Sequence, residues 1–154
     1  MRILLTGSDG YLGSLLAPKL LKLGHEVVGL DTGYYKERAL YRGEGPVPLT
    51  LTKDLRAIDK ADLAGFDAVV HMAELSNDPA GQLAPQITYE INHQGSVRLA
   101  EFARKAGVRR FVYMSSCSVY GVAGGDDYVT EESPTNPQTA YGICKTLVER
   151  DVRE

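Results

Sequence analysis

Short apolar runs rich in Val, Ile and Leu alternate with helical patterns along the 154 residues of this chain. Short strands separated by helices are typical of a parallel sheet whose two faces are both covered. With right-handed crossovers, five such strands predict an α/β fold, a doubly wound Rossmann-type parallel sheet with the strand order 3-2-1-4-5. The expected strands are residues 2–6, 26–30, a weaker one near 47–51, 67–73 and 110–115.

Three helices are expected between and after these strands. The first follows residue 10, and Pro18 inside it should kink the helix without breaking it. The third should begin at an Asn136-Pro137 cap and run to the end of the sequence. The second is a long amphipathic helix over 85–107, one face of which is expected to carry Ile87, Ile91, Gly95, Leu99 and Phe102.

Length and composition exclude several classes of protein. The chain suits one domain, residues 1–154, and its net charge of −3 comes without a basic stripe, so nucleic acid is not an expected partner. No stretch of 18 apolar residues or signal peptide is found, which predicts no membrane association and a cytoplasmic location. Cys117 and Cys144 are expected to stay reduced, and three scattered histidines do not predict a metal site.

The sequence "TGSDGYLG" (6–13) places a glycine-rich turn between the first strand and the first helix. Glycine allows a tight turn, a close approach of a pyrophosphate and packing of the helix on the sheet, while the helix N-terminus offers N–H groups to phosphate. A structural turn without a ligand is the alternative. We predict that the turn binds the phosphates of a dinucleotide through Gly7, Gly10, Tyr11, Leu12 and Gly13.

Asp31 ends the second expected strand. A carboxylate at this position can accept hydrogen bonds from both adenosine ribose hydroxyls, and it would repel a 2′-phosphate. Asp31 therefore favours NAD over NADP as the cofactor. Lys36 and Arg38 weaken this preference, because either could reach a 2′-phosphate if their loop, which lies within residues 32–48, folds back.

Two further motifs carry side chains suited to catalysis. In "YGICK", Tyr141 and Lys145 are four residues apart and share one face of the last expected helix. A phenol is a poor base at neutral pH, but a neighbouring ammonium favours the phenolate and lowers its pKa. In "MSSCSVYG" (114–121), the hydroxyls that follow the fifth strand either stabilise a turn or face a substrate.

Taken in order, these motifs resemble the extended short-chain dehydrogenase/reductases, and within them the NAD-dependent epimerase/dehydratase family that acts on nucleotide sugars. The resemblance also rests on "HMAE" (71–74) and "NHQG" (92–95), and it covers the whole chain. It implies that Tyr141 and Lys145 are the catalytic pair and contact the cofactor, Lys145 at the nicotinamide ribose. It further implies that Ser116 is the catalytic hydroxyl, with Ser115 and Ser118 supporting the turn.

The resemblance assigns further residues to the cofactor. It implies that Asp54 and Leu55 contact the adenine, and that Met72 and Ala73 line the cofactor groove. The alternatives are a loop cap for Asp54 and core positions for the others. Asn92 is implied to brace the helix behind the site, whereas a histidine that ends a buried strand, such as His71, is more often a packed core residue.

Two departures from the family pattern stand out. Glu74 occupies a position where the family usually has a small residue. The family also continues with further strands and a C-terminal domain that holds the nucleotide sugar, so the chain is expected to be an N-terminal part without the substrate domain.

The resulting hypothesis is an NAD-dependent nucleotide-sugar 4-epimerase that works as a homodimer. Dehydratases of the family carry an Asp-Glu pair after the catalytic hydroxyl, and Cys117 and Ser118 stand there instead. A nucleotide-sugar ketoreductase or dehydrogenase is the alternative enzyme, and an NAD-binding module without turnover is the alternative of a different class.

Overall fold

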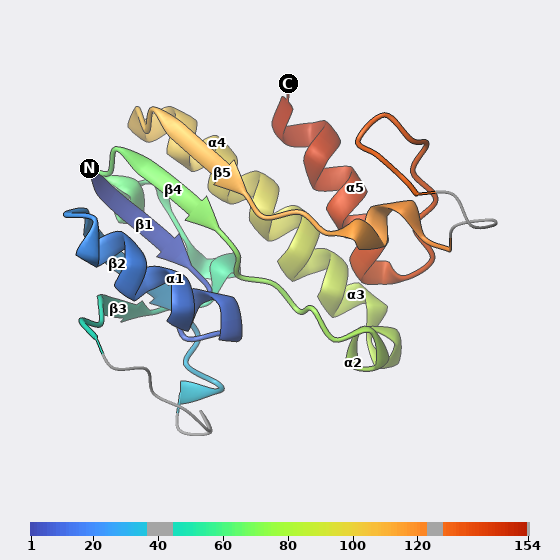
Figure 1. Ribbon diagram of the computed structural model, residues 1–154, viewed down its shortest axis with the longest axis horizontal. Coiled ribbons are helices and arrows are strands. Elements are labelled where there is room, and N and C mark those ends of the chain that lie inside the picture. Colours follow the sequence, from blue (N-terminus) through green and yellow to red (C-terminus); the bar gives the residue numbers. More distant parts are fainter. Residues whose placement is uncertain (37–44, 123–127, 154) are drawn as a thin grey trace. The chain divides into compact units, whose positions relative to one another are not determined.

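A computed structural model describes residues 1–36, 45–122 and 128–153 (Figure 1). The chain divides into two compact units, one of residues 1–73 and 98–114 and the other of residues 74–97 and 115–154. Arg38 and the Gly- and Asp-rich segment 123–127 lie outside the described residues. In the part of the chain that is described, no helix has the length and apolar character needed to cross a membrane.

The first unit is built on a parallel sheet. Its elements are β1 (Arg2–Thr6), α1 (Tyr11–Lys22), β2 (Glu26–Asp31), β3 (Leu49–Thr52), the 3₁₀ turns η2 (Leu55–Ala57) and η3 (Lys60–Leu63), β4 (Ala68–His71), most of α4 (Ser96–Ala106) and β5 (Arg110–Tyr113). All four strand pairs are parallel, and the strand order is β3-β2-β1-β4-β5. The predicted fold class and strand order are therefore confirmed, with strand ends displaced by one or two residues.

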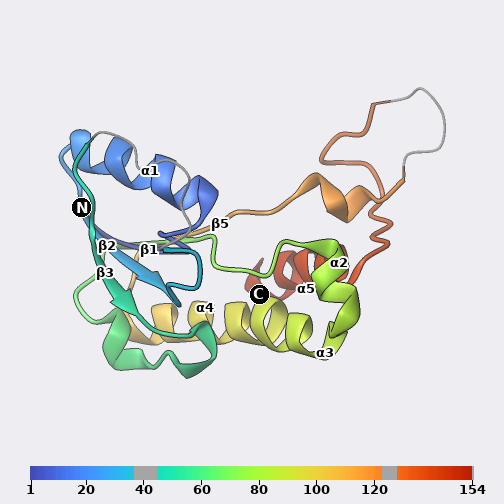
Figure 2. The same cartoon turned by 90° about the horizontal axis from the view of Figure 1, so that it is seen from below.

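Both faces of this sheet are apolar because successive residues of a strand point to opposite sides. Figure 2 shows α1 and α4 on opposite sides of the strands. The face toward α4 buries Leu4, Val28 and Val69 with Leu99 and Ala103. The face toward α1 buries Leu5, Val27 and Ala17, with Val70 packed against them. This two-sided burial explains why the central strands β1, β2 and β4 are continuous apolar runs, whereas the outer strands β3 and β5 are more exposed. Helix α1 runs unbroken through Pro18.

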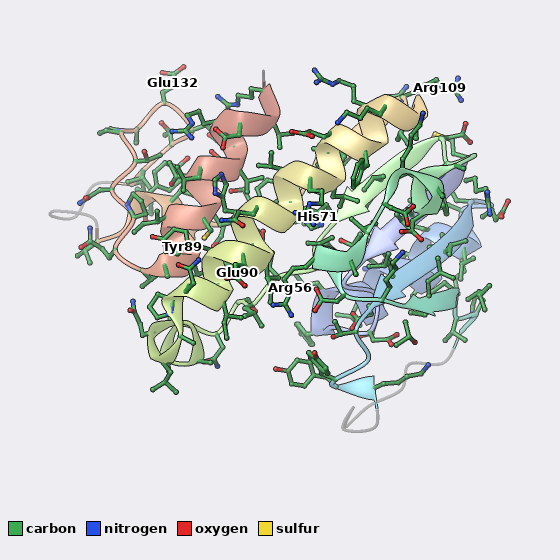
Figure 3. All side chains as sticks on the ribbon, turned by 180° about the vertical axis from the view of Figure 1, so that it is seen from behind. Arg56, His71, Tyr89, Glu90, Arg109 and Glu132 are labelled. Atoms are coloured by element: carbon green, nitrogen blue, oxygen red, sulfur yellow. The ribbon has the colours of Figure 1, made fainter. Side chains whose placement is uncertain are left out.

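A buried polar junction joins the ends of β1 and β4. The Thr6 hydroxyl oxygen accepts hydrogen bonds from the backbone N–H groups of Met72 and Ala73, each at 3.1 Å. Because these two bonds use both of its lone pairs, its own hydrogen donates to Nδ1 of His71 at 2.6 Å. His71 is fully buried at the end of β4 (Figure 3), which fits the expectation of a packed core histidine.

The second unit is helical. It contains α2 (Asp78–Leu83), α3 (Pro85–Thr88), the π-helical η4 (Tyr89–Gly95), the 3₁₀ turn η5 (Cys117–Tyr120) and α5 (Ala140–Arg153). α5 packs against α2, α3, η4 and η5. The sequence did not predict α2, although Asn77 caps it by accepting a hydrogen bond from the N–H of Ala80 at 2.9 Å.

The predicted face of the long helix is partly wrong. Gly95 and Leu99 are buried as expected, but Ile87 is 44% exposed. The fully buried side chains are instead Thr88, Asn92, Ser96 and Leu99. The wide π turn over residues 89–95 shifts which side faces inward. The Ser96 hydroxyl donates to the Asn92 carbonyl at 2.5 Å, whereas the buried Thr88 hydroxyl has no hydrogen-bond partner among the described residues.

The predicted start of the last helix is also wrong. α5 begins at Ala140, and the Thr139 hydroxyl, not Asn136, caps it by accepting from the N–H of Gly142 at 3.1 Å. The backbone N–H of Asn136 is already engaged, because it donates to the Val119 carbonyl at 2.9 Å. This bond ties the segment to η5, and the helix begins about one turn later than predicted.

We predict that Thr6→Val lowers the free energy of unfolding by about 3 kcal/mol, because it leaves two buried N–H groups and a ring nitrogen without their partner. Thr6→Ser is the matched control, since it keeps the hydroxyl and loses one methyl group, at about 1 kcal/mol. Urea unfolding of the three proteins measures the difference. Equal stability of the Val and Ser variants would contradict the role of the hydroxyl.

Candidate functional site

The glycine-rich turn packs closely on the residues that follow β4. Gly7 has a φ of +74°, and a Cβ placed on it would lie 2.9 Å from the backbone nitrogen of Ala73 and from the carbonyl carbon of Met72. A Cβ on Gly13 would lie 2.1 Å from the Gly7 carbonyl oxygen. Neither position accepts a side chain, so the turn needs glycine for its own packing. The structure brings Gly7, Met72 and Ala73 together, as the predicted cofactor groove requires.

The N-terminus of α1 is open to a ligand. Its capping residue Gly10 offers no side chain, and the first turn holds no acidic residue. The side chains of Tyr11 and Leu12 are 82% and 56% exposed. A helix of this length presents unpaired N–H groups and a positive dipole end to an anion. These features fit a dinucleotide pyrophosphate.

The Asp31 carboxylate lies beside this turn. Its two oxygens accept hydrogen bonds from the N–H groups of Asp9 at 3.1 Å and Gly33 at 2.9 Å. Each carboxylate oxygen keeps a further lone pair, so both ribose hydroxyls can still be bound. Asp9 adds a second acidic group, whose pKa is raised by burial and by the charge of Asp31, while Lys36 lowers it.

Asp54 and Leu55 have structural partners of their own. The Asp54 carboxylate caps η2 by accepting from the N–H of Arg56 at 2.8 Å, and it pairs with the Arg56 guanidinium at 2.7 Å. These bonds hold the pKa of Asp54 below its usual value. Leu55 is 3% exposed and packs in the core of the first unit. An adenine contact of this pair stays a prediction.

The second unit brings together the three predicted catalytic residues. Ser116 caps η5, where its oxygen accepts from the N–H of Ser118 at 3.2 Å and its hydroxyl donates to the Ser118 oxygen at 3.0 Å. The Ser116 hydroxyl also lies close enough to the Tyr141 phenol to act on its pKa, in the direction that favours the phenolate. Gly142 allows this approach of α5 to η5, because a Cβ there would lie 2.8 Å from the Ser118 carbonyl oxygen.

The other serine of the cluster, Ser115, donates a hydrogen bond to the Glu149 carboxylate on α5. Ser115 and Ser118 thus hold the turn in place, in agreement with the supporting role expected for them. Ser116 has both kinds of contact, with the turn and with Tyr141. The two interpretations of the serine cluster are therefore compatible.

Lys145 is buried in an ion pair with Glu74. Its Nζ lies 2.8 Å from Oε2 of Glu74, and the two side chains are 4% and 3% exposed. The ammonium also lies 5.4 Å from the centre of the Tyr141 ring. The unusual acidic residue of the "HMAE" motif is thereby the direct partner of the predicted catalytic lysine.

The Tyr141 phenol is not acidified in this structure. Burial is the main cause that raises the pKa of Tyr141, and the charges of Glu74, Asp78 and Cys117 raise it further. The hydrogen bond with Ser116 acts in the opposite direction. The expectation that Lys145 lowers this pKa is therefore not met, because Glu74 compensates the ammonium charge.

Sequence reasoning missed two groups that position the site. The Thr6 hydroxyl fixes the backbone of Met72 and Ala73. The only sign of it in the sequence is that Thr6 is a polar residue at the end of a buried strand. Asp78, which lies close enough to act on Tyr141, follows a capping asparagine that went unnoticed. Asn92 holds the backbone of Leu75 by two hydrogen bonds, at 2.8 and 2.9 Å, and so braces the segment that carries Glu74.

Among the described residues no His, Cys, Asp and Glu cluster is suited to a metal ion.

Comparison with known proteins agrees with this geometry. The model of the "NAD dependent epimerase/dehydratase family" matches residues 3–154. A UDP-glucose 4-epimerase of Neisseria meningitidis serogroup C is 33% identical over 97% of this chain and 46% of its own length. The chain thus spans about half the length of the curated relatives it matches.

Two solved structures share the fold over nearly the whole chain. A UDP-glucose-4-epimerase from Stenotrophomonas maltophila, with bound NAD and formylated UDP-arabinopyranose, has a TM-score of 0.82 and 30% identity over 97% of this chain and 47% of its own. A dTDP-glucose 4,6-dehydratase from Streptomyces venezuelae, with NAD bound, has a TM-score of 0.85 and 30% identity over 99% of this chain and 51% of its own. With its glycine turn, its Tyr-Lys helix and this match from end to end, the chain belongs to the NAD-dependent epimerase/dehydratase family.

Proposed function

We propose that this chain is the cofactor-binding and catalytic part of an NAD-dependent nucleotide-sugar 4-epimerase. The observation that carries the proposal is the grouping of Ser116, Tyr141 and Lys145 within one compact unit, with Lys145 Nζ 5.4 Å from the centre of the Tyr141 ring and Ser116 close enough to act on the phenol. The similarity to UDP-glucose 4-epimerases supports the substrate class and the reaction.

The first unit supplies the groups that would hold NAD. The open N-terminus of α1 would bind the pyrophosphate, and Asp31 would accept the adenosine ribose hydroxyls. Met72 and Ala73 would line the groove beside Gly7. When bound, NAD supplies a reversible hydride acceptor.

The second unit supplies the proton chemistry. Tyr141 takes the proton of the sugar 4-hydroxyl while the hydride leaves C4, the carbon that bears this hydroxyl, for the bound cofactor. Ser116 donates a hydrogen bond to the same oxygen and Lys145 supplies positive charge as the oxygen gains electron density. Rotation of the 4-keto sugar and return of the hydride to its other face give the epimer, and Tyr141 returns its proton.

Epimerisation is favoured over dehydration, because Cys117 and Ser118 provide neither the acid nor the carboxylate base that elimination of water needs. Two alternatives to an epimerase are kept. A ketoreductase or dehydrogenase would use the same three residues. A module that binds NAD without turnover is the alternative for the 154-residue chain by itself, because the chain spans about half of its relatives' length.

We also propose a cytoplasmic homodimer, in which the helix over 86–106 and the helix that carries Tyr141 pair with their copies across a two-fold axis in a four-helix contact. Leu83 and Ile87 are 89% and 44% exposed at the start of this helical region, which supports an apolar contact there. Light scattering at micromolar concentration should give twice the chain mass, and Ile87→Glu should halve it. Leu23→Glu, a change at an exposed apolar residue directly after α1, is the control, and a monomeric native chain would contradict the proposal.

Asp31 is expected to make the chain prefer NAD. Two like charges about 4 Å apart near a protein surface repel by about 4 kcal/mol, which exceeds the 1.4 kcal/mol of a tenfold change in Kd. Calorimetry should therefore give at least about tenfold tighter binding of NAD than of NADP. Asp31→Asn should reduce this ratio of the Kd for NADP to the Kd for NAD. Asp54→Asn is the matched control, because its carboxylate is engaged by Arg56 and its change should leave the ratio intact. Equal affinity of the native chain for both cofactors would exclude this role.

Tyr141→Phe is expected to lower kcat by about 10³-fold in the native gene product that contains this chain, since it removes the proton acceptor. NAD affinity should stay nearly unchanged, because no phosphate or ribose contact is lost. Ser116→Ala should lower kcat by about 10²-fold, whereas Ser118→Ala, which alters the same turn without touching the phenol, should cost much less. Turnover assays with UDP-galactose and calorimetry with NAD measure both. Wild-type turnover of Tyr141→Phe would refute the catalytic assignment.

A further inference from the structure

The buried Glu74–Lys145 ion pair is held rigidly in the second unit. The Asn92 side chain is fully buried and makes two hydrogen bonds to the backbone of Leu75. Its amide oxygen accepts one from the N–H of Leu75, and its amide nitrogen donates the other to the Leu75 carbonyl. This two-point clamp fixes the backbone immediately after Glu74. The carboxylate then meets Lys145 at 2.8 Å with almost no exposure of either side chain.

An ion pair at this place has an electrostatic consequence for the phenol beside it. Lys145 Nζ lies 5.4 Å from the centre of the Tyr141 ring, a distance at which an uncompensated ammonium would favour the phenolate. The Glu74 charge acts on the same phenol with the opposite sign. The pair as a whole carries no net charge toward Tyr141.

The other groups around Tyr141 do not restore the missing positive charge. Asp78 on α2 and Cys117 on η5 act on the phenol as negative groups, and Ser116 is the neutral hydroxyl that bonds it. On α5, burial and Glu74 raise the pKa of Cys144 to about 11, so this thiol is neutral at pH 7. From α3 and η4 the buried side chains are the neutral Thr88 and Asn92, and His93 pairs with Asp151 at 2.7 Å.

A merely structural role accounts poorly for the ion pair. Burying two charges costs several kcal/mol per ion before their attraction is counted, and apolar residues of similar volume often stabilise a core as well or better. The pair also lies beside the Tyr141 ring and not in the apolar core. Its position therefore points to the catalytic pair.

We propose that Glu74 is a positioning residue of the active site, which holds Lys145 in a buried ion pair and, by neutralising the ammonium, keeps Tyr141 protonated in the cofactor-free enzyme. The inference rests on the proposed function, which makes Tyr141 the base. Engagement of Lys145 by another partner would loosen the pair and free its charge to act on the phenol. Glu74 thereby links the protonation of the base to the occupancy of the site.

The test is a titration of the Tyr141 phenol in the cofactor-free chain. Labelling with [¹³Cζ]tyrosine gives one NMR signal for each of the nine tyrosines, and the signal missing in Tyr141→Phe identifies Tyr141. Glu74→Gln keeps the size and shape of the side chain but removes its negative charge, so the Lys145 ammonium is no longer compensated by Glu74. The titration midpoint of Tyr141 should then fall by at least about one pH unit.

Asp78→Asn is the matched control. It also removes a negative charge that acts on Tyr141, but Asp78 has no ion pair with Lys145 and its buried Oδ1 has no hydrogen-bond partner. Its midpoint should fall by clearly less than that of Glu74→Gln. Glu74→Asp, which keeps the charge, should stay close to the native midpoint.

An unchanged or higher midpoint in Glu74→Gln, or an equal fall in Asp78→Asn, would overturn the proposal. Should Glu74→Gln fail to fold, the double variant Glu74→Gln/Lys145→Gln, which buries no charge, carries the test. Because opposite effects then cancel, its midpoint should match the native one, and a shift of more than about one pH unit would contradict the inference. The titration uses neither substrate nor NAD, so its failure leaves the Tyr141→Phe turnover test of the proposed function intact.

Discussion

Parallel pairing of the five strands is the constraint on which the first unit depends. It brings the carboxyl ends of β1, β2 and β4 to one edge, although they are far apart in the sequence. There Gly7 packs against Met72, and Asp31 at the end of β2 binds the glycine-rich turn. The Thr6 hydroxyl then ties the end of β1 to the residues after β4. A single buried hydroxyl thus holds together the two segments on which the cofactor groove is expected to form.

The alternation of apolar runs and helices was enough to predict this sheet and its order, because burial on both faces leaves a continuous apolar run in the central strands β1, β2 and β4. The helical unit was harder to predict. Its inward face is polar at Thr88, Asn92 and Ser96, so the predicted apolar face was right only in part and wrongly included Ile87. The π turn that changes the face leaves no mark in apolar periodicity. The start of α5 was missed for a related reason, since the bond that ties the Asn136 backbone to Val119 is long-range and leaves no local pattern in the sequence.

The site shows the same division between local and long-range information. Spacing on one helix face was sufficient to pair Tyr141 with Lys145, and their proximity is seen in the structure. The partner of Lys145 lies far away in the sequence, after β4, and no local pattern predicts which charge will reach it. Glu74 was noticed as a departure from the family, yet its role could be assigned only from the fold. The effect of a charged residue on a site depends on which residue it pairs with, and the motif alone does not show this.

Electrostatics in the second unit follow from this pairing. An isolated buried carboxylate or ammonium would carry a desolvation cost of several kcal/mol, so neither Glu74 nor Lys145 is tolerable there alone. Together they form an ion pair, in which the Glu74 charge opposes the effect of the ammonium on the phenol that lies beside it. Burial and the nearby carboxylates then keep Tyr141 in its protonated form. The chemistry proposed for the phenol therefore requires a rearrangement of charge around Lys145, and the ion pair with Glu74 is where that rearrangement has to begin.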